Sequence, residues 1–100
     1  MTGPVTTGVG EAGTAEEALE LVRFCNVDVL VLDYSMPGGT GLEVLPKVLS
    51  QASDTRVVVF SAHPEDRLRE KSLKAGAVGF VQKCMGPERL LKAIRTAVAR

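Results

Sequence analysis

Three short apolar runs, separated by segments with helical periodicity, are the feature that most constrains how this chain folds. They extend from Val27 to Asp33, from Thr55 to Ser61 and from Val78 to Lys83. The first two are continuous and rich in valine and leucine, which is typical of parallel strands covered on both faces. Strands that alternate with helices over short connections imply right-handed crossovers. The sequence therefore predicts an α/β fold, an open parallel sheet with helices on both faces.

Two helices are predicted to start at capping boxes, in which a threonine and a glutamate side chain each accept a backbone N–H. The pattern at Thr14 to Glu17 begins a helix that ends near Cys25, and Thr40 to Glu43 begins the second. Pro46 falls inside the second helix and removes one of its hydrogen bonds, so we expect a kink or a delayed regular start.

Two further helices follow prolines. Pro64 and Pro87 each fit a first helical position, where the missing N–H carries no cost. Gly76 is expected to end the helix after Pro64 in a left-handed conformation. The helix after Pro87 is expected to bury an apolar stripe made of Leu90, Leu91, Ile94, Ala97 and Val98.

The start of the chain fits no regular element well. Val5 to Val9 contains strand-forming residues, but Pro4 and several glycines lie beside or within it. We expect residues 1–100 to form a single domain, with residues 1–8 either poorly ordered or a short edge strand.

The composition fits a soluble, cytoplasmic domain with a modest core. Hydrophobic residues make up 45% of the 100 residues, and the formal net charge is zero. Residues 1–50 hold seven acids and two bases, whereas residues 51–100 hold five acids and ten bases. These bases recur at helical spacing with acids among them, which favours solvated helix surfaces over a nucleic-acid site. We recognise no bilayer-length apolar segment and no leader, and Cys25 and Cys84 form neither a metal motif nor a disulfide framework.

Three polar side chains lie at the carboxyl ends of the predicted strands. They are Asp33, Ser61 and Lys83. Because the carboxyl ends of parallel strands meet at one edge of the sheet, these side chains should converge. A carboxylate placed there can attack an activated phosphoryl group and form an acyl phosphate, with an ammonium and a hydroxyl to stabilise the product oxygens.

A second motif competes for Asp33. Gly8, Gly10 and Gly13 form a G-x-G-x-x-G pattern before a predicted helix, and Asp33 follows twenty residues after Gly13. That spacing is found in dinucleotide-binding domains, where the acid binds a ribose hydroxyl. Two observations argue against a dinucleotide-binding site. The strand leading into the glycines would be short and would contain Pro4, and Ser61 and Lys83 at the ends of the later strands would have no role.

Plainer roles remain open for each residue. Asp33 could be a turn or helix cap, Ser61 could cap the following helix, and Lys83 could be a solvated strand end. His63 completes a formal hydrolase triad with Ser61 and Asp33, but no nucleophile elbow surrounds Ser61. Cys84 beside Lys83 is more simply an ordinary half-exposed thiol than an activated one.

Four segments of the sequence resemble one known family, and they occur in the family's order. They are VDVLVLDYSMPGGTGLEVL, TRVVVFSAH, KAGAVGFVQK and PERLLKAI. The family is the receiver domains of bacterial two-component response regulators, and the resemblance runs from about Val9 to the C-terminus. The details GEAG and SAH are most similar to regulators that end in a helix-turn-helix DNA-binding domain. The resemblance implies a flavodoxin-like sheet and a signalling domain rather than an enzyme.

The resemblance also implies the chemistry of the site. Asp33 would accept a phosphoryl group from the phosphohistidine of a histidine kinase, and Lys83 would pair with the acceptor. The backbone carbonyl of Ser35 would bind Mg²⁺ together with Asp33.

A switch is implied as well. Ser61 would be the hydroxyl that moves toward the phosphoryl oxygens, Ala62 the small residue beside it, and Phe80 the aromatic residue whose rotamer follows. The surface carrying Arg67 to Lys74 and Arg89 to Arg95 would be the output or homodimer face.

One part of the family pattern is missing from this chain. The family begins with an apolar strand ending in two acids, followed by a helix, whereas Val5 to Gly13 corresponds to the second strand and its loop. We expect an N-terminally incomplete sheet in which Val5 to Val9 and Val27 to Asp33 flank a gap or pair directly. Either arrangement invites a second chain. Without the two acids, Mg²⁺ binding should be weak and phosphorylation poor.

Two explanations fit this difference. The chain is the truncated product of a longer gene, or it is a degenerate receiver that acts as a phosphorylation-independent interaction module. In both cases we expect neither direct nucleic-acid binding nor membrane binding by this chain.

Overall fold

A four-stranded parallel sheet forms the centre of the computed structural model, which describes residues 8–25, 27–36, 39–52, 54–62 and 66–99. The strand order is β1-β2-β5-β6, and each neighbouring pair is parallel. The strands are β1 (Val9–Ala12), β2 (Val29–Asp33), β5 (Arg56–Ser61) and β6 (Gly79–Gln82). The three predicted apolar runs are therefore confirmed as strands, each slightly shorter than predicted.

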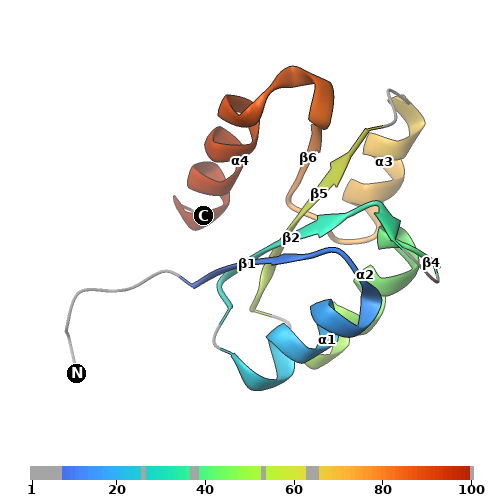
Figure 1. Ribbon diagram of the computed structural model, residues 1–100, viewed down its shortest axis with the longest axis vertical. Helices are drawn as coiled ribbons and strands as arrows, with labels where there is room; N and C mark the ends of the chain where they lie inside the picture. Colours follow the sequence, from blue (N-terminus) through green and yellow to red (C-terminus); the bar gives the residue numbers. More distant parts are fainter. Residues whose placement is uncertain (1–7, 26, 37–38, 53, 63–65, 100) are drawn as a thin grey trace.

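Helices cover both faces of this sheet, as predicted. Figure 1 shows α4 on one side of the sheet and the other three helices on the opposite side. The helices are α1 (Ala15–Phe24), α2 (Gly41–Gln51), α3 (Asp66–Lys74) and α4 (Pro87–Ala99), with a short 3₁₀ helix η1 (Lys83–Met85) before α4. This arrangement is the predicted flavodoxin-like fold. None of the described helices combines the length and apolarity needed to cross a bilayer.

The core consists of two clusters, one on each face of the sheet. Leu30, Leu32 and Val59 belong to the cluster that meets α1 and α2. Val29 and Val58 belong to the cluster that meets α4. Because successive side chains of a strand point to opposite faces, a strand covered on both sides must be apolar at every position. This explains why the apolar runs are continuous.

The predicted capping box at the start of α1 is present. The Glu17 N–H donates to Thr14 Oγ1 over 3.0 Å, and the Gly13 N–H donates to Glu17 Oε1 over 3.1 Å. Pro87 is the first residue of α4, and Gly76 after α3 has a φ of +112°, both as predicted. Pro64 lies outside the described residues.

Helix α2 continues through Pro46, so the expected delay in its regular start does not occur. Val44, Leu45 and Val48 are buried against the sheet, whereas Pro46 lies on the exposed side. Burial of that apolar face offsets the hydrogen bond that the proline removes.

The first strand that the structure describes is Val9–Ala12, and Gly8, inside the expected Val5 to Val9 run, precedes it. Residues 1–7 lie outside the described part of the chain. Gly10 sits inside β1 because α1 passes close to it: a methyl group at this position would lie 3.3 Å from Leu21 Cδ1. A glycine in this strand therefore serves packing and does not interrupt pairing.

Strand β1 pairs directly with β2, which is the second of the two arrangements expected. Val9 is in register with Val29, and Ala12 with Leu32. Flavodoxin-like domains commonly have five strands in the order 2-1-3-4-5, in which a first strand separates the second from the third. That separating strand has no counterpart among the described residues, which agrees with the predicted incomplete sheet.

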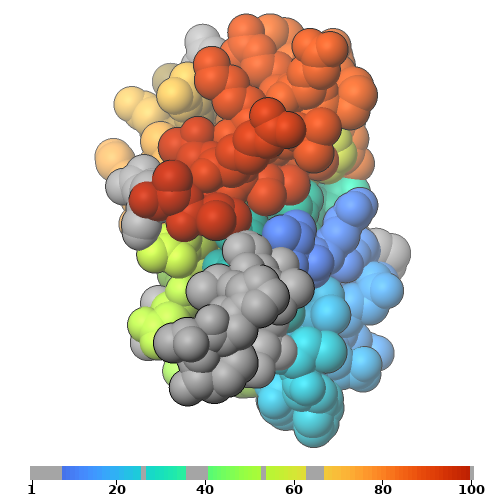
Figure 2. Space-filling model, turned by 90° about the vertical axis from the view of Figure 1, so that its left-hand side faces the viewer, coloured from blue at the N-terminus to red at the C-terminus, as the bar shows by residue number. Residues whose placement is uncertain are grey.

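The prediction that α4 buries Leu91 and Val98 is wrong. These side chains are 52% and 41% exposed, whereas Ala97 is buried and Leu90 and Ile94 are half-buried. The reason is the position of α4, which packs mainly on β5 and β6 and less on β2, so that one flank of the helix is not against the described strands. Figure 2 shows α4 above β1 on the same side of the molecule.

Candidate functional site

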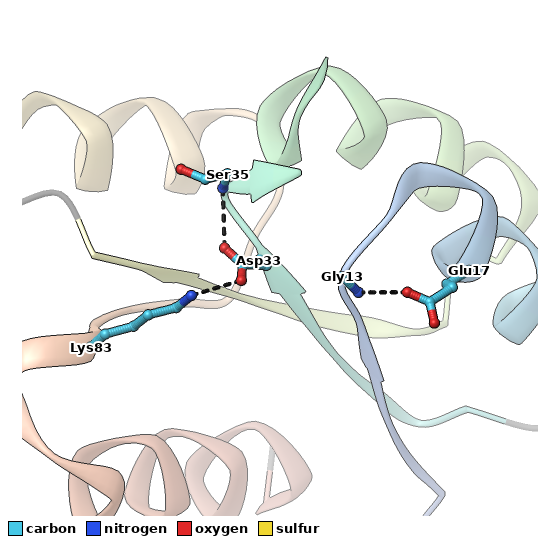
Figure 3. Close-up of polar contacts among 5 residues, drawn as sticks. All are labelled: Gly13, Glu17, Asp33, Ser35 and Lys83. Carbon is cyan, nitrogen blue, oxygen red and sulfur yellow. Dashed lines mark hydrogen bonds and ion pairs between the residues drawn. The ribbon is translucent and has the colours of Figure 1, made fainter. Parts of the chain in front are cut away.

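Asp33 and Lys83 meet at the carboxyl edge of the sheet. Asp33 is the last residue of β2, and Lys83 follows β6 as the first residue of η1. Lys83 Nζ lies 2.7 Å from Asp33 Oδ2, a hydrogen-bonded ion pair (Figure 3). The predicted convergence of these two side chains is therefore present.

Strand β5 lies between them and supports the lysine. Asp33 is in register with Phe60, and the Lys83 ammonium lies 5.3 Å from the centre of the Phe60 ring. An ammonium at this distance from an aromatic face is attracted by the ring. Sequence reasoning missed Phe60, because its place beside Asp33 follows from the register of β5 against β2, which the sequence pattern does not specify.

The second carboxylate oxygen is also held. Asp33 Oδ1 accepts the backbone N–H of Ser35 over 3.1 Å, an Asx-type contact that fixes the orientation of the carboxylate. The Asp33 and Lys83 side chains keep 27% and 36% of their surface exposed. The pair is thus oriented and still accessible from solvent.

The chain after Asp33 turns back in a small hairpin that the sequence analysis did not predict. Strands β3 (Ser35–Met36) and β4 (Gly39–Thr40) are antiparallel, and α2 begins directly after them. The Gly41 N–H donates to the Tyr34 carbonyl over 2.8 Å. A methyl group on Gly41 would lie 2.9 Å from the Asp33 carbonyl oxygen, so the backbone at the acceptor tolerates no larger residue there.

Ser61 is the last residue of β5, but it does not face the same way as Asp33. Because Phe60 is the residue in register with Asp33, strand alternation directs Ser61 to the opposite face of the sheet. Its side chain is fully buried, whereas Ala62 beyond it is exposed.

Phe80 lies on the same face of the sheet as Ser61. It is in register with Val59, two residues before Ser61, and it is half-buried against the cluster that meets α1 and α2. Ser61 and Phe80 are therefore near neighbours on adjacent strands, separated by the sheet from the Asp33 carboxylate.

The described residues do not fit a magnesium site. Mg²⁺ is bound through carboxylate and other oxygen ligands in an octahedral arrangement. No three acidic, histidine or cysteine side chains come together among the residues that the structure describes. The Asp33 oxygens are already engaged by Lys83 and Ser35, and Ser35 itself lies in the β3–β4 hairpin. Weak metal binding therefore stays a prediction.

The glycine motif does not form the turn that a dinucleotide needs. Gly10 is inside β1, and Gly8 precedes that strand, so Gly13 alone lies between β1 and α1. The Gly13 N–H is already satisfied by Glu17 Oε1, at a distance from the Asp33–Lys83 pair (Figure 3). Cys25 and Cys84 are exposed free thiols. The triad with His63 is not tested, because His63 lies outside the described residues.

Residues 5–95 match the family described as the response regulator receiver domain. The chain belongs to this family. The geometry shows three features of a receiver domain. They are an acidic residue at the end of an apolar strand, a lysine directly after the last strand, and a four-stranded parallel sheet of the flavodoxin-like kind.

The proteins similar to this chain include response regulators. The nitrate/nitrite response regulator protein NarL of Escherichia coli K12 is 44% identical over 98 residues, which is 96% of this chain and 44% of NarL. The chain thus spans less than half the length of that relative. A LuxR-family response regulator from Aurantimonas superposes with a TM-score of 0.85 at 24% identity, covering 94% of this chain and 86% of the other.

A further solved structure has a modified acceptor. It is a response regulator protein from Burkholderia pseudomallei with a phosphorylated aspartic acid, calcium ion and citrate. Its TM-score is 0.78 at 16% identity, and the match covers 88% of this chain and 66% of that one. At this identity the similarity shows the fold alone.

Proposed function

We propose that this receiver accepts a phosphoryl group on Asp33 from a histidine kinase and changes an interaction surface in response. The observation that carries the proposal is the Asp33–Lys83 ion pair of 2.7 Å at the carboxyl edge of the sheet. A phosphorylated aspartate in a protein of the same fold supports it. The chain serves as the acceptor in this transfer reaction.

The chemistry follows from the two contacts of the carboxylate. An Asp33 oxygen forms a bond to phosphorus while the bond between phosphorus and the kinase's histidine nitrogen breaks. That nitrogen keeps the electron pair, and the ring leaves as neutral imidazole because its other nitrogen already carries a proton. One existing contact must be replaced as the phosphoryl group arrives. Lys83 is at the end of a flexible side chain and can move from Asp33 Oδ2 to a phosphoryl oxygen, whereas the Ser35 N–H belongs to the backbone.

The response of the switch requires Ser61 to turn. Its hydroxyl is buried on the face opposite Asp33, so contact with a phosphoryl group requires rotation around the edge of the sheet, beside the small Ala62. That rotation changes the space next to Phe80 on the same face. We propose that phosphorylation shifts the population of Phe80 rotamers in this way.

Transfer to Asp33 is expected to be impaired. The donor set described above offers no site for a divalent ion, so Lys83 alone offsets the repulsion between Asp33 and an incoming phosphoryl dianion. Mg²⁺ is therefore expected to bind weakly and to accelerate transfer little.

The experiment is phosphoryl transfer followed by intact-protein mass spectrometry. The chain is incubated with a phosphorylated histidine kinase or with phosphoramidate, with and without Mg²⁺, and Asp33→Asn is the matched control. The expected result is a slow gain of one phosphoryl group in the parent chain and none in the variant. Equal labelling of both proteins, or none in either, would reject Asp33 as the acceptor.

A phosphorylation-independent interaction module is the second candidate, and one observation favours it. A groove of about 380 Å³ runs along β6 between α3 and α4. Its rim carries Arg69, Arg89 and Lys92, and Phe80 and Met85 contribute apolar surface. Such a groove suits an acidic, partly apolar protein segment. A partner that binds the parent chain and Asp33→Asn with equal affinity would favour the module.

We propose a cytoplasmic setting for both candidates. The basic residues lie on helix surfaces with acids among them, and we assign no DNA contact to them. Any effect on transcription would then come from a partner protein or from a longer form. The groove, or the open side of β1, would be the surface through which this chain meets a partner or a second copy.

A further inference from the structure

One flank of α4 is apolar and exposed. Arg89, Lys92 and Thr96 line the groove beside β6, so this flank of the helix faces away from β1. Leu91 and Val98 are seven residues apart and therefore share one side of the helix, on the opposite flank from the groove. That flank faces the β1 side of the sheet.

A basic residue lies between these two apolar side chains. Arg95 is four residues after Leu91 and three before Val98, which makes it a neighbour of both on the helix surface. It is exposed, like Leu91 and Val98. The flank therefore presents an apolar, a basic and an apolar side chain in succession.

The face of β1 beside this helix presents the complementary pattern. Gly10 and Ala12 point toward α1 and are buried, so Val9 and Glu11 point to the face on which α4 lies. Val9 is 49% exposed, and Glu11 is exposed. Figure 2 shows the blue N-terminal part of the described chain below α4 on this side of the molecule.

These two patterns are self-complementary. A two-fold rotation can place the α4 flank of one copy on the β1 face of a second copy. The symmetry then also places the α4 flank of the second copy on the β1 face of the first. Each contact covers apolar side chains on both partners and brings Arg95 toward Glu11 of the other copy.

We propose that the α4 flank formed by Leu91, Arg95 and Val98 docks on the Val9–Glu11 face of a second copy of this chain. The resulting dimer buries the exposed side chains of Val9 and Glu11. The contact does not involve Asp33 and does not depend on its phosphorylation. It also leaves the groove along β6 free, because that groove lies on the other flank of α4.

The first test is the molar mass of the full chain in solution, measured by sedimentation at increasing protein concentration. The parent chain and Asp33→Asn are expected to shift equally from monomer to dimer. Leu91→Asp should remain monomeric at concentrations at which the parent is dimeric, while its circular dichroism spectrum and melting curve stay close to those of the parent. Lys92→Glu, on the groove side of the same helix, is the matched control and should still dimerise.

A charge exchange tests the pairing itself. Glu11→Arg and Arg95→Glu should each weaken dimerisation at least about tenfold when alone, because each places like charges in both contacts. A mixture of the two variants should form a heterodimer, since one of its contacts then joins the two exchanged charges and the other keeps the native pair. Three results would each overturn the proposal. The parent chain could stay monomeric, the dimer could be lost in Lys92→Glu but not in Leu91→Asp, or the mixture of the two charge variants could fail to associate.

Discussion

Lys83 lies on Asp33 across strand β5: its ammonium is 2.7 Å from Oδ2 of a residue fifty positions earlier in the chain. Both side chains remain partly exposed, so the pair contributes on the order of 0.2–1 kcal/mol to stability. Its main effect is electrostatic and local, because it partly neutralises the carboxylate that we propose as acceptor.

Replacing the lysine should therefore separate stability from transfer. In Lys83→Gln the free energy of unfolding should fall by less than about 1 kcal/mol, whereas phosphoryl transfer to Asp33 should slow by about tenfold or more. Urea denaturation and time-resolved mass spectrometry measure the two effects. Lys74→Gln, on exposed α3, is the control and should change neither; a Lys83→Gln protein with unchanged transfer would remove Lys83 from the site.

Phe60 should interact measurably with Lys83. A double-mutant cycle with Phe60→Leu, Lys83→Gln and the combined variant isolates their interaction from the packing lost with the ring. We expect an interaction free energy of about 0.5–1 kcal/mol from urea denaturation, the usual size for an ammonium over an exposed aromatic face. A cycle that pairs Phe60 with Lys74 should give a value near zero, and equal values for the two cycles would contradict the contact.

Gly41 should not tolerate a side chain. A methyl group there meets the Asp33 carbonyl oxygen at 2.9 Å and the Tyr34 Cα at 3.2 Å, both of them backbone atoms. Gly41→Ala should lower the free energy of unfolding by about 1–3 kcal/mol, measured from the urea midpoint, because one of the two backbones must shift. At Gly13 the nearest atom is the end of the Glu17 side chain at 3.6 Å, so Gly13→Ala is the matched control. Equal effects of the two changes would argue against the close approach.

The first helix should depend on its cap. Thr14→Ala removes the acceptor for the Glu17 N–H, which should lower the free energy of unfolding by about 1 kcal/mol in urea. Thr14→Ser keeps the oxygen and should restore most of that loss. If serine behaved like alanine, the threonine methyl group, and not its hydroxyl, would be the stabilising part.

The sequence was sufficient for the central sheet and for the Asp33–Lys83 pair because both depend on simple rules. Continuous apolar runs mark strands covered on both faces, and the carboxyl ends of parallel strands must share an edge. Thr14 and Pro87 marked helix starts through local hydrogen bonding alone, without any knowledge of packing.

The failures came from properties that only the packed chain defines. Gly10 looked like an interruption of a strand, but the close passage of α1 requires a small residue there. Leu91 and Val98 continue an apolar stripe in sequence, yet the width of the sheet under α4 decides which part of that stripe is buried. The orientation of Ser61 depends on the register of β5 against β2, which the sequence pattern does not specify.

The order of the strands has a consequence for how the chain can assemble. In β1-β2-β5-β6 the spatial order of the sheet is also the order of the chain. Among the described strands, each later strand adds to the edge of the strand before it, and none lies between two strands that come earlier in the sequence. Each of these pairings closes a loop that contains one crossover, so the residues that pair are close together in the sequence. The four described strands can therefore pair in the order of the chain, from β1 at one edge to β6 at the other.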